Sequence, residues 1–297
     1  MLTLTTKAVI RSMTAAHVPA AKAHSGENVK FITLDAMGNQ YVGQPSYEIN
    51  EDLVGNPATG PLYIEEANPG DTLKVTILDV ILPSSANMTI APGVGVFADE
   101  VQTLQRRVFS LSNGNMLFNN KLHLPLKPMI GFIGVAPDSG ELPNSYPGSH
   151  GGNMDNKRIE PGTVIYLPVY HKGALLAIGD VHALMGDGEV SICAAEAEAE
   201  VTIRVDVIKR SYDTILVVGH GRVMTVNTAG TLEVAGFEAA KAMRRFLKVE
   251  LGMDDFESCS ILSLVGDMCI CQVVDPLMTC RMEVPLSIFD AYGYTFE

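Results

Sequence analysis

The chain has 297 residues, of which 47% are hydrophobic and 19% charged, so it can bury a large core and is not expected to be disordered. Its formal net charge is −13 and no run of basic residues is longer than a pair such as Arg244 and Arg245, which argues against nucleic acid or an anionic membrane as a partner. Apolar runs such as TILVVG (214–219) are shorter than the roughly 20 residues that cross a bilayer. Residues 1–24 lack a signal-peptide pattern, which predicts a cytoplasmic protein.

Alternation of apolar and polar residues predicts that most of the first two thirds of the chain is strand. The alternation is regular at 72–78 and 200–208, and in the first of these Leu73, Val75 and Ile77 share one face. Glycine-containing turns introduce three expected strands, at SGENVKF (25–31), NPGDTLKV (68–75) and EPGTVIYL (160–167). The sequence therefore predicts a mainly β fold.

A long Gly/Pro-rich passage at 134–153 exceeds an ordinary connection and is expected to be a binding loop. A helical period first appears at 232–252, and Gly252 is expected to end that helix. The face predicted for it consists of Phe237, Ala240, Leu247 and Leu251.

The last third of the chain predicts mixed α and β structure. A second helix is expected at about 255–265, and buried strands at 268–275 and 279–287. We therefore expect a β-rich part at 1–210 that carries the functional site, with a smaller α+β part at 211–297 packed against it.

The five cysteines do not have the spacing of a structural zinc site. Four of them crowd the C-terminal segment: Cys259, Cys269, Cys271 and Cys280. We expect buried, reduced thiols, and Cys193 is expected to be an inert strand residue rather than a nucleophile.

The segment GDVHALMGDGEV (179–190) contains several metal-ligand residue types. Strand residues two apart project to the same side, so Asp180 and His182 are expected to lie side by side, as are Asp187 and Glu189. Imidazole combined with carboxylates is a ligand set that suits zinc or a similar divalent ion. The alternative is a polar hairpin tip capped by its own side chains.

The segment HGGNMDN (150–156) is a second group of polar residues among glycines. His150, Asn153 and Asp155 are capable ligands, and glycines such as Gly152 let a substrate approach the backbone. An ordinary turn is the alternative.

Other polar residues have weaker signals. Glu65 and Asp275 occupy positions where a carboxylate is either a turn cap or part of a site. A serine triad is not expected, because the G-x-S-x-G elbow is absent from the sequence.

Several longer segments resemble the acetamidase/formamidase family. They occur in order along nearly the whole chain: FITLDAMGNQ (31–40), NPATGPLYIEEANPGDTLKV (56–75), KPMIGFIGV (127–135), GFIGVAP (131–137), PGSHGGNMDN (147–156), YLPVYHKGALLAIGDVHALMGDGEV (166–190) and QVVDP (272–276).

This resemblance implies a sandwich- or barrel-like β domain with a smaller α+β part. It also implies hydrolysis of short-chain amides such as formamide and acetamide, a divalent metal near the motifs, and a homodimer or larger homo-oligomer. Asp180, His182 and Glu189 match the family pattern GD-x-HA-x-x-GDGE, and Asn153 and Asp155 match HGGN-x-D. The chain departs from the long formamidases in its shorter length and in having no tryptophan, so any aromatic pocket wall must differ.

These observations give two functional hypotheses. The first is a metal-dependent amidohydrolase, with zinc favoured and calcium as the alternative ion. Its predicted residues are Glu189, Asp155 and His150 for catalysis, Asp180, His182 and Asp187 for the metal, and Asn153, Gly152 and Glu65 for the substrate. The second is a metal-stabilised β domain that binds a small ligand without turnover.

Overall fold

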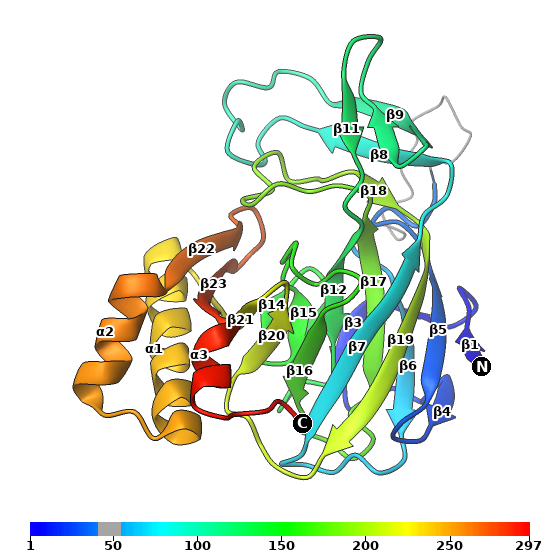
Figure 1. Ribbon diagram of the computed structural model, residues 1–297. Helices are drawn as coiled ribbons and strands as arrows, with labels where there is room; N and C mark the ends of the chain where they lie inside the picture. Colours follow the sequence, from blue (N-terminus) through cyan, green and yellow to red (C-terminus); the bar gives the residue numbers. More distant parts are fainter. Residues whose placement is uncertain (41–54) are drawn as a thin grey trace.

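The computed structural model describes residues 1–40 and 55–297 and consists mainly of two large sheets (Figure 1). The first sheet has nine strands in the order β1 (Leu2–Leu4), β5 (Asn28–Thr33), β19 (Ala199–Ile208), β7 (Thr72–Ile81), β16 (Val164–Pro168), β20 (Ile215–Gly219), β21 (Arg222–Ala229), β23 (Met278–Pro285) and β22 (Asp267–Gln272). The predicted strands at 72–78 and 200–208 correspond to β7 and β19, which pair antiparallel along their length.

The second sheet carries several of the segments that resemble family motifs, including 131–134, 151–153 and 176–182. Its main path runs β11 (His123–Pro125), β10 (Asn115–Leu117), β9 (Gln105–Ser112), β8 (Ser85–Ile90), β18 (Glu196–Ala197), β17 (Leu176–His182), β12 (Met129–Gly134), β15 (Gly151–Asn153) and β14 (Pro147–Gly148). Off this path, β6 (Ala58–Ile64) pairs with β17, β2 (Val9–Ile10) and β4 (Ala21–Ala23), while β3 (Ser12–Thr14) and β13 (Glu141–Pro143) form a separate pair.

The main core lies between the two sheets. Phe31, Val75 and Val201 from the first sheet are fully buried in one cluster with Ile130 and Ile178 from the second. Alternate residues of β5, β7 and β19 enter this core, which explains the two-residue period of these segments. The prediction of a mainly β, sandwich-like fold is confirmed.

Three helices cover the end of the first sheet: α1 (Leu232–Leu251), α2 (Asp255–Val265) and α3 (Leu286–Ala291). The Thr231 side chain caps the start of α1, and Gly252 ends it with a left-handed φ of 68°. The predicted bounds of α1 and α2 are confirmed. The predicted face of α1 is wrong in part, because Phe237 is 50% exposed. The buried face contains mostly small residues: Ala235, Gly236, Ala239, Ala242, Met243, Phe246 and Leu247.

The C-terminal α+β part continues the first sheet rather than forming a separate one. Strand β20 pairs with β16 through Val164–Val218, Ile165–Val217 and Tyr166–Leu216. The sheet therefore crosses the predicted boundary at 210, and β20 to β23 reach the site-bearing sheet from one side (Figure 1).

No helix in the described ranges, 1–40 and 55–297, has the length and apolar character to cross a membrane. All five cysteines are free. Cys193, Cys271 and Cys280 are buried as expected, but Cys259 is exposed.

Candidate active site

The site is built at the end of β17, the strand that lies between β12 and β18. All seven residues of β17 are buried, including Asp180 and His182. Asp180 has a left-handed φ of 49°, which is uncommon for a residue other than glycine. Its Oδ1 atom lies 3.4 Å from Nε2 of His182, so the two side chains lie side by side, as the strand spacing predicts.

Three further carboxylates surround the same imidazole. Nε2 of His182 lies 3.2 Å from Oε2 of Glu196, 3.9 Å from Oδ1 of Asp155 and 4.0 Å from Oε1 of Glu189. Glu196 faces His182 directly across the β17–β18 pair. Asp155 follows β15, and Glu189 lies in the segment after β17; both have left-handed φ values, 42° and 46°. Strained backbone of this kind concentrates at functional sites.

The cluster is buried but not satisfied by hydrogen bonds. His182, Asp155, Asp180, Glu189 and Glu196 are each 9% exposed or less. Within the described ranges, both oxygens of Asp155, both ring nitrogens of His182 and Oε2 of Glu196 have no hydrogen-bond partner. Buried polar atoms normally have partners, so this group is a candidate site for a ligand that binds several oxygens and a nitrogen at once.

The donor set fits a divalent cation. Two overlapping groups have ligand atoms within 4.8 Å of one another: Asp155, Asp180 and His182, and His182, Glu189 and Glu196. A cation would offset the repulsion among carboxylates that share a low-dielectric site. The combination of one imidazole with carboxylates is compatible with zinc, and its richness in oxygen is also compatible with calcium.

The pKa shifts describe the same electrostatic conflict. Burial raises the pKa of Asp155 well above its usual range, and the charge of Glu189 raises it further. Burial likewise raises the pKa values of Glu189 and Glu196. Burial alone would lower the pKa of His182, yet Glu196 and Asp180 raise it well above its ordinary value.

Gly131 on β12 leaves the space in which two of these carboxylates lie. A Cβ atom at this position would be 2.3 Å from Oδ1 of Asp155 and 2.9 Å from Oδ2 of Asp180. Neither distance is possible between non-bonded atoms, so any side chain here must displace the two acids. The same Cβ atom would also lie 2.8 Å from the backbone carbonyl oxygen of Asp180, so Gly131 is explained both by the acids of the site and by the close approach of the β17 backbone.

A chain of amide and carboxylate groups leads away from the cluster. Asn56 donates through Nδ2 to Oδ1 of Asn153 at 2.8 Å and to Oδ2 of Asp180 at 3.2 Å. Asn153 in turn donates through Nδ2 to Oδ2 of Asp275 at 2.9 Å. Burial raises the pKa of Asp275 to about 7, although Asp155 and Asn153 act in the opposite direction. Asp275, from the segment after β22, thus lies next to the acids of the second sheet.

His150 and Gly152 lie beside the cluster in sequence but are not part of it. His150 is 1% exposed, and its Nε2 atom has no hydrogen-bond partner in the described part of the chain. A Cβ atom on Gly152 would lie 2.9 Å from that nitrogen and 2.4 Å from the carbonyl oxygen of Tyr146. Gly152 therefore allows close packing of β14 and β15 around His150. Burial lowers the pKa of His150 to about 4.

Asp187 and Glu65 are not brought to His182. The carboxylate of Asp187 accepts hydrogen bonds from the guanidinium of Arg281 at 2.7 and 2.9 Å. It also forms an ion pair with Lys157 at 2.9 Å. The expectation that Asp187 and Glu189 point the same way is wrong, because the chain turns between them at Gly188 (φ 99°). Glu65 forms an ion pair with Lys22 at 2.9 Å, at the exposed end of β6.

Sequence reasoning missed Glu196 and Asn56 and left Asp275 open. Glu196 belongs to an alternating run, EAEAE (196–200), in which spacing does not show which glutamate reaches a site. Its pairing opposite His182 decides that, and such a register is not a local property of the sequence.

The chain is similar to known acetamidases and formamidases in sequence and in structure. A model of the Acetamidase/Formamidase family matches residues 143–291. A putative formamidase from Schizosaccharomyces pombe is 30% identical over 261 residues, covering 65% of this chain and 62% of that protein. The crystal structure of an acetamidase from Bacillus halodurans has a TM-score of 0.96 and 39% identity, covering 98% of this chain and 100% of that chain.

The structure of a predicted acetamidase/formamidase from Thermoanaerobacter tengcongensis also has a TM-score of 0.96, at 36% identity and 99% coverage of both chains. This chain thus spans less than two thirds of the yeast relative but nearly the whole of both solved chains.

Replacing Gly131 by alanine tests whether the glycine makes room for the cluster. We expect Gly131→Ala to fold but to bind zinc roughly 10- to 100-fold more weakly, the range for disturbed ligand support, because the added Cβ displaces Asp155 and Asp180. Competition with a chromogenic chelator measures this affinity. Gly230→Ala is the matched control, since a Cβ there meets no atom within 4 Å. Equal zinc affinity in both variants would contradict the role given to Gly131.

The buried neutral His150 predicts a component of acid sensitivity. Its folded-state pKa of about 4 lies below the unfolded value of 6.5, so the unfolded chain binds the proton first as pH falls. Stability is therefore lost from about pH 6.5 downwards, and the loss levels off below about pH 4. For His150→Gln we expect the fall in unfolding free energy between pH 7 and pH 5 to be smaller by about 2 kcal/mol.

Urea denaturation at both pH values measures this difference. His123→Gln, at an exposed histidine on β11, serves as the control and should retain the parent's pH dependence. A His150→Gln variant that loses as much stability as the parent would show that His150 is not held neutral.

Proposed function

We propose that this chain, which belongs to the Acetamidase/Formamidase family, hydrolyses short-chain amides to a carboxylic acid and ammonia. The observation that carries this proposal is the group of four buried carboxylates around Nε2 of His182. The similarity of the chain to a putative formamidase and to an acetamidase of known structure supports it.

We propose that His182, Asp180 and Asp155 hold a divalent cation, with zinc favoured and calcium as the alternative. Glu196 and Glu189 complete an overlapping group around the same imidazole. When bound, such an ion lowers the pKa of a water molecule toward 7 and polarises the amide carbonyl. Glu196 also accepts a hydrogen bond through Oε1 from the backbone of Ala194 at 2.9 Å, which fixes the direction of its other oxygen toward His182.

Glu189 is proposed as the general base. It is the most exposed member of the cluster at 9%, so an attacking water can reach it more easily than the other acids. The base takes a proton from that water and delivers it to the leaving nitrogen, because an amide anion is too poor a leaving group to depart unprotonated. A role of Glu189 as a cation ligand is the alternative, and the variant below separates the two.

Asn153 and Gly152 are proposed to position the substrate. Asn153 is 4% exposed and lies between Asn56 and Asp275 in the chain of amide and carboxylate groups. Because the cluster and Asn153 are buried to this degree, the site favours a small uncharged molecule, which supports a short-chain amide as substrate. His150 packs beneath Gly152, so we place it behind the substrate site rather than at the reacting atoms. The expected homo-oligomer and cytoplasmic location remain predictions.

Ammonia release from formamide and acetamide tests the proposed function directly. We expect the purified protein to release ammonia from at least one of them, to lose this activity after dialysis against a strong chelator, and to recover it when zinc is added back. The metal content of each sample provides the control. Absence of ammonia release by the metal-loaded protein would exclude the amidase, and full activity in metal-free protein would exclude the metal dependence.

The variant Glu189→Gln tests the proposed base. Glutamine preserves the shape of the side chain but cannot accept the proton, so turnover is expected to fall by roughly 10²- to 10⁴-fold with metal content unchanged. Glu200→Gln is the matched control, because Glu200 on β19 is half exposed and pairs with Lys30. Loss of metal from Glu189→Gln would identify Glu189 as a ligand, and retained activity would remove it from the mechanism.

A further inference from the structure

Arg281 on β23 is the largest fully buried side chain in the described part of the protein, with 1% exposure. Its guanidinium donates from Nη1 to Oδ1 of Asp187 at 2.7 Å and from Nη2 to Oδ2 at 2.9 Å. Nε donates to Oε1 of Glu283 at 2.6 Å, and Nη1 also donates to the carbonyl oxygen of Ile270 at 2.9 Å. A buried guanidinium is tolerated only with such partners, so removing Asp187 would leave the charge poorly compensated.

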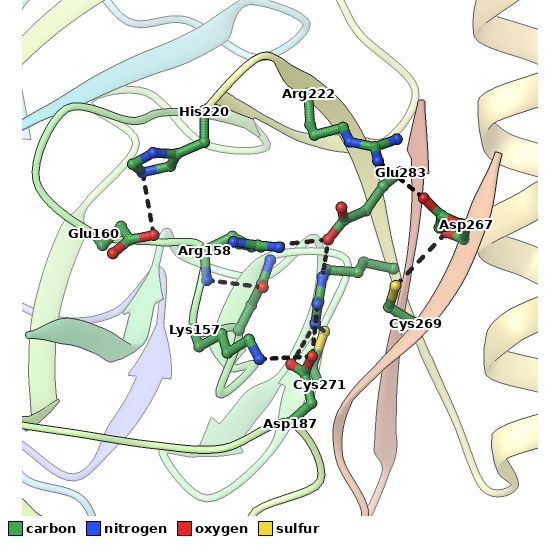
Figure 2. A network of polar contacts seen from close by, with 12 residues as sticks. Lys157, Arg158, Glu160, Asp187, His220, Arg222, Asp267, Cys269, Cys271 and Glu283 are labelled. Atoms are coloured by element: carbon green, nitrogen blue, oxygen red, sulfur yellow. Dashed lines mark hydrogen bonds and ion pairs between the residues drawn. The ribbon is translucent and has the colours of Figure 1, made fainter. Parts of the chain in front are cut away.

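Two further cations complete this network. Lys157 lies 2.9 Å from Oδ2 of Asp187, and Arg158 lies 3.4 Å from Oε1 of Glu283. Figure 2 shows the Lys157 side chain reaching the carboxylate of Asp187, below Glu283 and Arg158. The network therefore joins three segments that are distant in the sequence: 157–158 after β15, the turn after β17, and β23 of the other sheet.

The backbone beside Asp187 is attached to the same strands. The Gly188 nitrogen donates to the carbonyl oxygen of Cys271 at 2.8 Å, and the Val273 nitrogen donates to the carbonyl oxygen of Gly188 at 3.1 Å. Gly188 and Gln272 form an isolated parallel bridge. The turn is thus fixed on one side by the fork between Asp187 and Arg281 and on the other by the end of β22.

This attachment determines where Glu189 points. Glu189 follows Gly188 directly and has a left-handed φ of 46°, a conformation that a glutamate does not favour by itself. Because Asp187 is held on Arg281 and Gly188 on Cys271, the following residue is directed to the opposite side, toward His182. The same end of β22 directs Asp275, since Oε1 of Gln272 accepts from the backbone nitrogens of Val274 and Asp275 at 2.8 and 3.0 Å.

We propose that Asp187 and Arg281 form a positioning pair that holds Glu189 at the reacting centre, and that Asp187 is not a metal ligand. This inference rests on the proposed function, because it assigns a role relative to the proposed base. Both oxygens of Asp187 already accept from cationic groups. Binding a metal ion would require this fork to break and would leave Arg281 buried without its main partner.

The test is a double-mutant cycle between Asp187→Asn and Glu189→Gln. In the parent background, Asp187→Asn is expected to lower kcat roughly 10- to 100-fold, with KM within about twofold and metal content unchanged, because the base is misplaced rather than removed. In the Glu189→Gln background the same change is expected to have almost no further effect on kcat. Arg281→Lys keeps the charge but loses the fork, so it should show the same dependence on Glu189.

Asp206→Asn is the matched control, since it removes the carboxylate of another arginine fork, formed with Arg204 on the exposed side of β19. It should leave kcat unchanged. An equal loss of kcat from Asp187→Asn in both backgrounds would overturn the proposal, because it would show a general structural effect. Loss of metal from Asp187→Asn would also overturn it.

Hydrogen exchange separates this inference from the amidase activity itself. Asp187→Asn and Arg281→Lys are expected to speed exchange of the backbone amides at 186–192 and 272–275, whereas Asp206→Asn is not. If the parent protein releases no ammonia, the proposed function fails while the exchange result still decides whether the fork holds this turn. Unchanged exchange in both fork variants would overturn the positioning role.

Discussion

The main physical constraint on this structure is the burial of four carboxylates around one imidazole. Asp155, Asp180, Glu189 and Glu196 approach His182 from separate segments, and none of them is exposed enough for water to stabilise its charge. Such a group is unfavourable in a low-dielectric interior unless a cation or protons offset the repulsion. Several local features of the fold serve this group, including the left-handed backbone of three of the acids and the glycine at 131.

The two sheets divide the work of holding this group. The second sheet supplies Asp180, His182 and Glu196 from the paired strands β17 and β18. The register of this pair sets the positions of their side chains. The first sheet contributes through β22 and β23, whose ends hold the turn that carries Glu189 and the segment that carries Asp275. The residues carried by strands, Asp180, His182 and Glu196, are held more precisely than side chains on free loops.

The sequence predicted features that depend on neighbouring residues and missed those that depend on pairing. The period of β7 and β19, the ends of α1 and the adjacency of Asp180 and His182 all follow from local spacing. The buried face of α1 was misassigned because small residues rather than Phe237 face the sheet: a Cβ on Gly236 would lie 2.6 Å from Sδ of Met268. The contact of Glu196 with His182 spans 14 positions of the chain, and that of Arg281 with Asp187 spans 94. No short sequence pattern shows contacts of this range.

The pairing of β16 with β20 also bears on how the chain matures during synthesis. Until residues 215–219 have left the ribosome, β16 has an unpaired edge, and an open edge of a buried strand is a site for aberrant association. Arg281 and Asp275 are made later still, so the contacts that they make with Asp187 and Asn153 cannot form until almost the whole chain has been synthesised.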